Sequence, residues 1–164
     1  MKEISQTEIE IGLGLYKSEY RLVKNAYYAN GLLTADIIPV SYIFTTDDLN
    51  YLTATQIHLY LSQLTYILIA NCLKDSEYKV VSRYLTFDDF MSKMYAGQLF
   101  FVEVDQKMKK VIYKNNEPIT SELKIIYSRR VGKSIFFEMS FDIAKGSCIG
   151  TILTSMKPEQ YGNK

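Results

Sequence analysis

The stretch NYLTATQ, residues 50–56, combines hydroxyl and amide side chains with the start of a long apolar run. Thr53 and Gln56 have the spacing of a capping box, in which each side chain accepts a hydrogen bond from the other residue's backbone N–H. This spacing predicts a helix that starts at about Ala54. The free N–H groups of Ala54 and Thr55 would stabilise negative charge developing on a carbonyl oxygen. Every helix has such an end, and most bind only water or a cap.

The acid and base groups near this stretch are few. Asp47 and Asp48 precede it and are the nearby candidates for a general base, although their types also suit a loop and a cap. The single histidine, His58, falls one turn inside the predicted helix and is expected to be a core or interface residue. One histidine and two distant cysteines cannot assemble a usual zinc site, so no metal is expected. Cys72 and Cys148 are predicted to be buried free thiols.

Composition excludes several partners. The 164 residues contain 19 Lys and Arg against 18 Asp and Glu, a net charge of +1, which gives no broad positive field for nucleic acid or an anionic membrane. The N-terminus lacks a signal-peptide pattern, and polar residues interrupt the apolar helix, so we expect a cytoplasmic protein that does not enter a membrane. The length predicts one domain, 1–164, with an N-terminal extension over about 1–15 and a frayed tail over about 157–164.

The apolar run itself predicts a nearly uncharged central helix. Ile57, Leu61, Leu64 and Leu68 recur at helical spacing, and their neighbours widen the stripe over most of the circumference. At 1.5 Å per residue, about 20 residues extend roughly 30 Å, the width of a small domain. Such a helix must be enclosed by other elements.

Strand-like runs flank this helix on both sides. Residues 20–29 and 32–44 surround an Asn-Gly pair, a strong hairpin signal, and Pro39 indicates that the second strand is an edge or is broken there. A short helix is predicted from Thr86, and residues 5–15 suggest another, weakened by two glycines. Residues 98–113, 120–130, 133–143 and 147–156 then predict an antiparallel meander. An apolar helix lying across one face of an antiparallel sheet is an α+β arrangement, the hotdog fold.

Three short motifs carry a resemblance to a known family: Ser-Tyr-Ile at Ser41–Ile43, Gln-Leu-x-Tyr at Gln63–Tyr66, and Asp-Asp-aromatic at Asp88–Phe90. With the strands around them, over about residues 20–156, they resemble the FcoT-like thioesterase family. Its members are hotdog proteins that act on fatty acyl thioesters of coenzyme A or acyl carrier protein. Relatives in isonitrile lipopeptide pathways are described as adding glycine across the double bond of an enoyl thioester.

The resemblance implies a site at the helix entrance. The family places a tyrosine before the helix, which matches Tyr42, and a further tyrosine near the N-terminus, which matches Tyr16. Its asparagine corresponds to Asn50 when counted forward from Tyr42, and to Thr53 when counted back from Gln63. The capping box favours Thr53, in which case a hydroxyl replaces the amide of the family. All of these side chains are neutral hydrogen-bonding groups rather than charged ones.

The resemblance also implies where a substrate would lie. The acyl chain would run between the helix and the sheet beside Leu61, Leu64 and Leu68, close to Gln63 and Tyr66 of the motif. The turn that holds Arg129, Arg130 and Lys133 could bind coenzyme A phosphates or an acidic carrier protein, although charged turns are usually just solvated. No cofactor is expected beyond coenzyme A or phosphopantetheine as part of the substrate.

These expectations leave three functions open. They are hydrolysis of a fatty acyl thioester, a lyase reaction that adds an amine such as glycine to an enoyl thioester (or eliminates one), and non-catalytic acyl binding. In each case the resemblance implies a homodimer or higher homo-oligomer that pairs its sheets, with sites at the subunit interface.

Overall fold

The computed structural model describes residues 1–39, 49–115 and 117–157. Within these residues the elements are, in chain order, β1 (Lys2–Glu3), α1 (Gln6–Gly12), η1 (Ser18–Tyr20), β2 (Val23–Ala29), β3 (Leu32–Ile37), α2 (Ala54–Lys74), α3 (Lys79–Ser82), α4 (Phe87–Tyr95), β4 (Leu99–Met108), β5 (Ile119–Val131), β6 (Ser134–Ile143) and β7 (Cys148–Met156).

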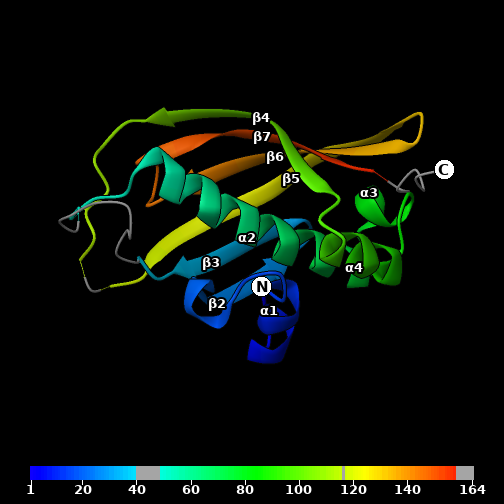
Figure 1. Ribbon diagram of the computed structural model, residues 1–164, viewed down its shortest axis with the longest axis horizontal. Helices are drawn as coiled ribbons and strands as arrows, with labels where there is room; N and C mark the ends of the chain where they lie inside the picture. Colours follow the sequence, from blue (N-terminus) through cyan, green and yellow to red (C-terminus); the bar gives the residue numbers. More distant parts are fainter. Residues whose placement is uncertain (40–48, 116, 158–164) are drawn as a thin grey trace.

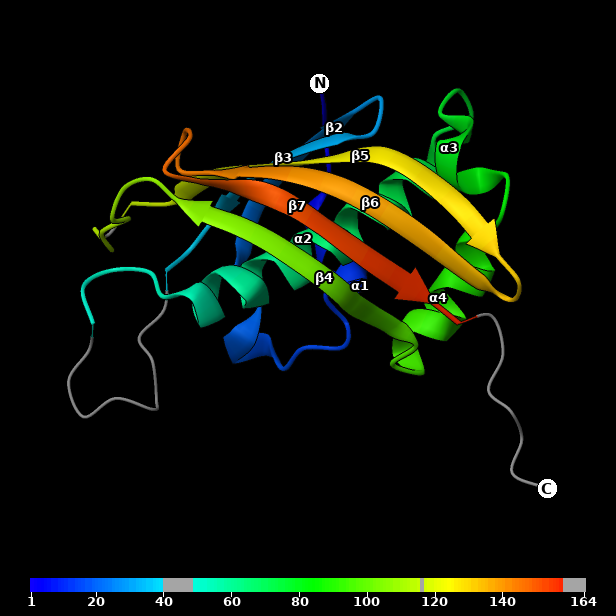
Figure 2. The same ribbon diagram turned by 90° about the horizontal axis from the view of Figure 1, so that it is seen from above.

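The strands form one antiparallel sheet. Among the described residues it has seven strands in the order β1-β2-β3-β5-β6-β7-β4. One edge is the two-residue β1, and the other is the ten-residue β4. Figures 1 and 2 show α2 lying across one face of this sheet. The predicted α+β arrangement of a long helix against an antiparallel sheet is therefore confirmed.

The predicted start of α2 is also confirmed. Thr53 is the N-cap, its Oγ1 accepts from the Gln56 N–H at 3.3 Å, and Gln56 Oε1 accepts from the Thr53 N–H at 2.9 Å. The stripe of Ile57, Leu61, Leu64 and Leu68 is buried in the core. Because α1, α3 and α4 also contact α2, the helix is enclosed on more than its sheet face.

The N-terminal segment belongs to this enclosure. A second capping box, between Ser5 and Glu8, starts α1, and Ile9 and Leu13 are buried in the same core as α2. Figure 1 shows α1 and the segment that follows it next to α2. The predicted extension over about 1–15 therefore contributes apolar contacts to the core.

The first hairpin forms at the predicted turn. Asn30 and Gly31 have φ angles of 48° and 76°, as a type I′ turn requires, and β2 pairs with β3 on either side. Besides its positive φ, Gly31 has a second reason to lack a side chain: a Cβ there would lie 2.3 Å from the Tyr78 ring. Of the predicted second strand, β3 ends at Ile37, and residues 40–44 lie outside the described part.

The predicted meander is wrong for its first strand. β5, β6 and β7 are consecutive neighbours, but β4 pairs with β7 rather than with β5. The strand predicted over 98–113 ends at Met108, and β5 begins at Ile119. Alternating sequence patterns report which face of a strand is buried, but they do not report which strand lies next to it.

The two cysteines are buried and free, as predicted. Among the described residues, none of the helices combines the length and the hydropathy that a membrane span needs.

Candidate functional site

The entrance of α2 offers backbone donors. The hydroxyl of Thr53 and the side chain of Gln56 are used in the capping box. Within the described part of the chain, the N–H groups of Ala54 and Thr55 have no protein partner, and both residues are exposed. Asn50 lies three residues before the N-cap and is exposed, and its carbonyl accepts from the Lys114 N–H at 2.7 Å. The structure thus brings Asn50, Thr53, Ala54 and Thr55 together at one end of the helix, as predicted.

A stripe of residues faces away from the sheet along α2. Thr55, Leu59, Ser62 and Tyr66 recur every three or four residues, on the side opposite Leu61 and its apolar neighbours. We call these four residues the outer stripe. The first of the four, Thr55, also has one of the two free N–H groups at the helix entrance. The outer stripe therefore begins at that entrance and continues along α2.

Tyr16 lies against the outer stripe. Its hydroxyl is 2.7 Å from Ser62 Oγ, and its ring meets the Tyr66 ring edge-on with centroids 6.2 Å apart. Ser62 Oγ donates to the Leu59 carbonyl at 2.8 Å, which leaves its lone pairs to accept from the Tyr16 hydroxyl. Ser62 therefore fixes the direction of the Tyr16 phenol. The sequence did not single out Ser62, although its spacing from Thr55 and Tyr66 could have shown that the three share a face.

Both tyrosines are held in the neutral form. Burial raises the pKa of Tyr66 to about 12, with a smaller contribution from neighbouring Tyr16. Burial likewise raises the pKa of Tyr16, partly offset by its hydrogen bond with Ser62. At neutral pH these phenols donate or accept hydrogen bonds but do not act as phenolate bases or nucleophiles.

The predicted site residues lie at two separate positions along α2: the helix entrance and the Tyr16–Ser62 pair. Thr55 and Ser62 are separated by seven residues, which at 1.5 Å per residue corresponds to about 10 Å along the helix. The entrance residues and the Tyr16–Ser62 pair therefore lie on one face of α2, but within one chain they do not surround a single atom. The structure brings Tyr16 to the helix that the resemblance implies, one to two turns beyond the entrance.

Gln63, which was predicted to bind substrate, forms hydrogen bonds with the backbone of the segment between α1 and β2. Its Oε1 accepts from the Leu22 N–H at 2.9 Å, and its Nε2 donates to the Tyr20 carbonyl at 2.7 Å. The side chain is fully buried. Both ends of the amide are thus occupied in holding the segment between α1 and β2 against the helix, and Arg21 Nε donates to the Tyr16 carbonyl in the same segment.

The leucines predicted to line the acyl chain are core residues. Leu61, Leu64 and Leu68 each have 0 % exposure. An acyl chain between α2 and the sheet would have to displace these side chains.

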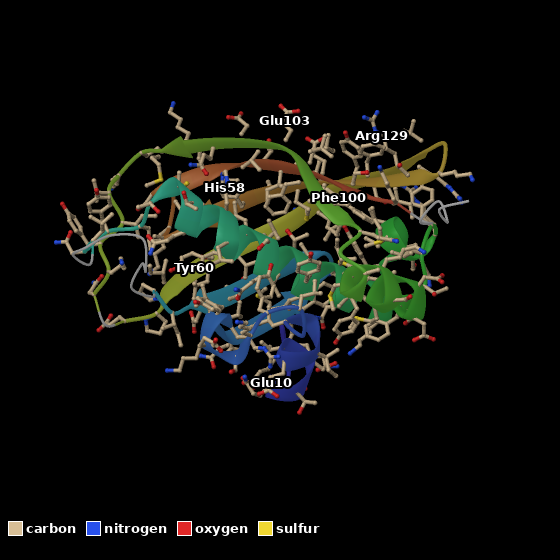
Figure 3. All side chains as sticks on the ribbon, in the orientation of Figure 1. Glu10, His58, Tyr60, Phe100, Glu103 and Arg129 are labelled. Atoms are coloured by element: carbon tan, nitrogen blue, oxygen red, sulfur yellow. The ribbon has the colours of Figure 1, made fainter. Side chains whose placement is uncertain are left out.

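The predicted basic turn lies far from the helix entrance. Arg129, Arg130 and Lys133 lie where β5 passes into β6, and Figure 3 shows Arg129 on the outer side of the sheet at the opposite end from His58 in the first turns of α2. The Arg129 guanidinium lies over the rings of Tyr127 and Phe136 at 5.9 and 5.8 Å. Arg130 donates to the Gly132 carbonyl. The structure therefore does not bring this turn and the helix entrance into one site.

Three other predicted residues need separate mention. Tyr42, Asp47 and Asp48 lie outside the described residues. His58 is exposed, so its assignment to the core is wrong, while its assignment to a subunit interface stays a prediction.

Two cavities lie away from the outer stripe. One of about 510 Å³ lies at the C-terminal end of α2, between Asn71, Lys74 and Asp75 and the N-terminal residues. It contains the ion pair between Lys74 and Glu8, at 2.9 Å. A second cavity of about 380 Å³ lies between the β4–β5 connection and the β6–β7 turn.

Known structures resemble this chain over nearly its whole length. Cj0977, a sigma28-regulated virulence protein of Campylobacter jejuni, is 10% identical with a TM-score of 0.50, over 98% of this chain and 97% of its own. A variant of the thioesterase PA1618 of Pseudomonas aeruginosa is 12% identical with a TM-score of 0.50, over 95% and 96%. The CurJ dehydratase is 13% identical with a TM-score of 0.50, over 95% of this chain and 49% of its own, so this chain spans about half of its length.

These likenesses, with the helix lying across the sheet, support the hotdog fold. At such identities they show the fold alone. No protein-family model and no curated protein sequence matches the chain.

The contacts of Gln63 predict a loss of stability on Gln63→Leu. The change leaves the Leu22 N–H and the Tyr20 carbonyl without their partner, and a buried unsatisfied group costs about 1–3 kcal/mol. Urea denaturation should show the free energy of unfolding lowered by that amount, and hydrogen exchange at the Leu22 amide should accelerate. Gln6→Leu, the same change on the exposed side of α1, should stay within about 0.5 kcal/mol of the wild type. A Gln63→Leu protein as stable as the control would contradict this role.

The raised pKa of Tyr66 predicts instability in alkali. Its folded pKa of about 12 exceeds the ordinary 10.0, so its contribution is fully present below pH 10 and is lost as the pH rises to 12. A shift of two units corresponds to about 3 kcal/mol. In urea denaturation at a series of pH values, Tyr66→Phe should lose less stability over this interval than the wild type, by up to that amount. Tyr113→Phe, at an exposed tyrosine, should follow the wild type. Parallel curves for all three proteins would disprove the assignment.

Proposed function

We propose that this protein is a hotdog-fold enzyme that acts on fatty acyl thioesters and hydrolyses them, as the resemblance to the FcoT-like family implies. The observation that carries the proposal is the pair of free N–H groups of Ala54 and Thr55, at the entrance of a buried helix and at the start of the outer stripe. Such a pair can donate hydrogen bonds to a carbonyl oxygen that becomes negative during acyl transfer. The likeness to solved structures that include a thioesterase and a dehydratase supports the same class.

In the proposed reaction, water adds to the thioester carbon while the carbonyl oxygen accepts hydrogen bonds from the two amides. The carbon–sulfur bond then breaks, the thiol leaves with a proton, and the free acid remains. Tyr42 and either Thr53 or Asn50 would orient the water. The hydroxyl of Thr53 is the better placed of the two, because it is fixed at the first turn by Gln56, whereas Asn50 lies three residues earlier in an exposed bend.

The Tyr16–Ser62 pair would hold the substrate rather than make or break bonds. It lies about 10 Å along the helix from the amides, too far to share their carbonyl within one chain. A neutral phenol of fixed direction on the outer stripe suits a polar group of the substrate. Changes at Tyr16 should therefore act mainly on KM, and changes at the helix entrance mainly on kcat.

We also propose that this protein forms a dimer. Figure 1 shows β4 along one edge of the sheet, where ten residues present an unpaired row of backbone groups. Phe100 and Val102 on this strand are 49% and 54% exposed. The first four residues of this edge strand, 99–102, are apolar and invite pairing, and two copies can pair antiparallel about a two-fold axis. We propose that the first part of β4, around Phe100 and Val102, forms this contact and that sites on α2 are completed at the subunit interface.

The function predicts a defined product. Octanoyl-CoA and an octenoyl-loaded carrier protein would be incubated with the enzyme, with and without glycine, and analysed by mass spectrometry. Hydrolysis releases the free acid. A product heavier by the mass of glycine would show the lyase reaction instead, and unchanged substrate that stays bound would show acyl binding without catalysis.

The same assay tests the assigned residues. Tyr42→Phe is expected to lower kcat by about a hundredfold, the usual contribution of a positioned proton donor. Thr53→Ala should also lower kcat, while Thr53→Ser should keep it, because the hydroxyl is retained. Tyr127→Phe, on the outer face of the sheet, is the matched tyrosine control. A Tyr42→Phe enzyme with the turnover of the wild type would remove Tyr42 from the site.

We expect charged substitutions on β4 to dissociate the proposed dimer. In analytical ultracentrifugation at micromolar concentration, the wild type should sediment as a dimer or a higher even oligomer. Replacing both Phe100 and Val102 by Lys should give monomers, because charge on an edge strand opposes pairing. Replacing Ile126 and Val131, similarly exposed on β5, should leave the oligomer intact. A monomeric wild type would refute pairing through β4.

A further inference from the structure

Four lysines occur in eight residues at the end of β4. The sequence KMKKVIYK, residues 107–114, contains Lys107, Lys109, Lys110 and Lys114 and no acid, in a chain whose net charge is only +1. Lys145 joins them from the β6–β7 turn, because the N–H groups of Lys109 and Lys110 both donate to the Ser147 carbonyl in that turn, at 2.8 and 3.2 Å. We call these five lysines, together with Val111 and Tyr113 between them, the lysine surface.

The lysine surface is tied directly to the entrance of α2. The Leu52 N–H donates to the Ile112 carbonyl at 2.8 Å, the Lys114 N–H donates to the Asn50 carbonyl at 2.7 Å, and Tyr51 and Tyr113 form an antiparallel bridge. Leu52 immediately precedes the N-cap Thr53. The positive charges are therefore attached to the residues that lead into the proposed site, unlike the charges of Arg129 and Arg130 at the other end of the sheet.

Four of the five charges of the lysine surface are available for a partner. Among the described residues, Lys107, Lys109, Lys110 and Lys145 make no ion pair. The nearest acids in the sequence are Asp105, Glu117 and Asp142, and the Asp142 carboxylate accepts from the Gly146 N–H within its own turn.

Apolar side chains among the lysines distinguish this surface from an ordinary solvated loop. Val111 is 55% exposed and Tyr113 is 61% exposed. Beside them lies the cavity of about 380 Å³, lined by Ile112, Tyr113, Thr120 and Lys145 among others. Exposed aromatic and apolar residues next to a pocket, with charges around them, fit the apolar centre and polar rim of a protein–protein interface.

We propose that the lysine surface docks the acidic surface of a carrier protein, whose phosphopantetheine arm delivers the thioester to the entrance of α2. This inference rests on the proposed function. The charges suit a protein better than the phosphates of a free nucleotide, because the lysines are distributed over residues 107–114 and the β6–β7 turn. They are also lysines on an open surface, with no arginine to grip a phosphate in two places.

Direct binding tests the docking without any turnover. A purified bacterial acyl carrier protein, in the holo form without an acyl group, is labelled and titrated in fluorescence anisotropy at about 0.05 M and about 0.5 M salt. The wild type should bind at low salt and bind more weakly at high salt, because exposed charge pairs are screened. A variant with Lys107, Lys109, Lys110 and Lys145 all changed to Gln should raise Kd about tenfold to a hundredfold, since four exposed charge pairs are lost.

The matched control changes four other exposed lysines to Gln: Lys24, Lys79, Lys124 and Lys157. It has the same net charge as the test variant and should keep the Kd of the wild type. Equal losses in both variants would overturn the proposal in favour of a net-charge effect. It would also be overturned by a wild type that does not bind the carrier, or by a test variant with an altered oligomeric state, which would make the surface a contact between copies.

Two small substrates separate docking from catalysis. Octanoyl-N-acetylcysteamine has neither a phosphate nor a protein, so its hydrolysis tests the proposed function alone and should be equal in the wild type and the lysine variant. Octanoyl-CoA has phosphates but no protein, and its KM should change much less than that of the octanoyl carrier protein. A rise in KM for octanoyl-CoA, with carrier binding unchanged, would assign the lysines to phosphates and overturn the docking.

Discussion

The enclosure of α2 is the constraint on which the rest of the structure depends. A helix with almost no charge is stable in water only when other elements cover it, and here the sheet covers one face while α1, α3 and α4 contact others. The buried polar groups of the helix have to be paired inside the protein. Gln63 is paired with the backbone of the preceding segment, and Thr65 donates to the Leu61 carbonyl. The parts of α2 that are left for the proposed reaction are the first turn and the outer stripe.

The same enclosure determines the kind of chemistry that this helix can support. Burial disfavours charge, and it raises the pKa of both tyrosines beside the outer stripe. The donors that remain are neutral hydroxyl groups and backbone amides. Groups of this kind stabilise a developing oxyanion by being fixed in place beforehand, and the two features that fix them are the capping box at Thr53 and the hydrogen bond between Ser62 and Tyr16.

Features that depend on neighbouring residues could be predicted from the sequence. The capping box gave the start of α2, and the Asn-Gly pair gave the first hairpin, because each depends on groups within three or four residues of one another. The partner of β4 could not be predicted, because the strand pairs with β7 more than forty residues later. The role of Gln63 was missed for the same reason: its partners lie 41 and 43 residues earlier in the chain.

The placement of β4 also brings the lysine surface to the entrance of α2. Because β4 lies beyond β7, the chain has to pass the ends of β7 and β6 to reach β5, and before it does so it is hydrogen-bonded to the entrance of α2. Backbone hydrogen bonds to Asn50, Leu52 and Ser147 fix that connection there. Substituting the lysine side chains therefore leaves the attachment intact. A partner that docked on this connection would lie next to Tyr51, two residues before Thr53, so its thioester would be delivered to a first turn of α2 that the capping box has already fixed.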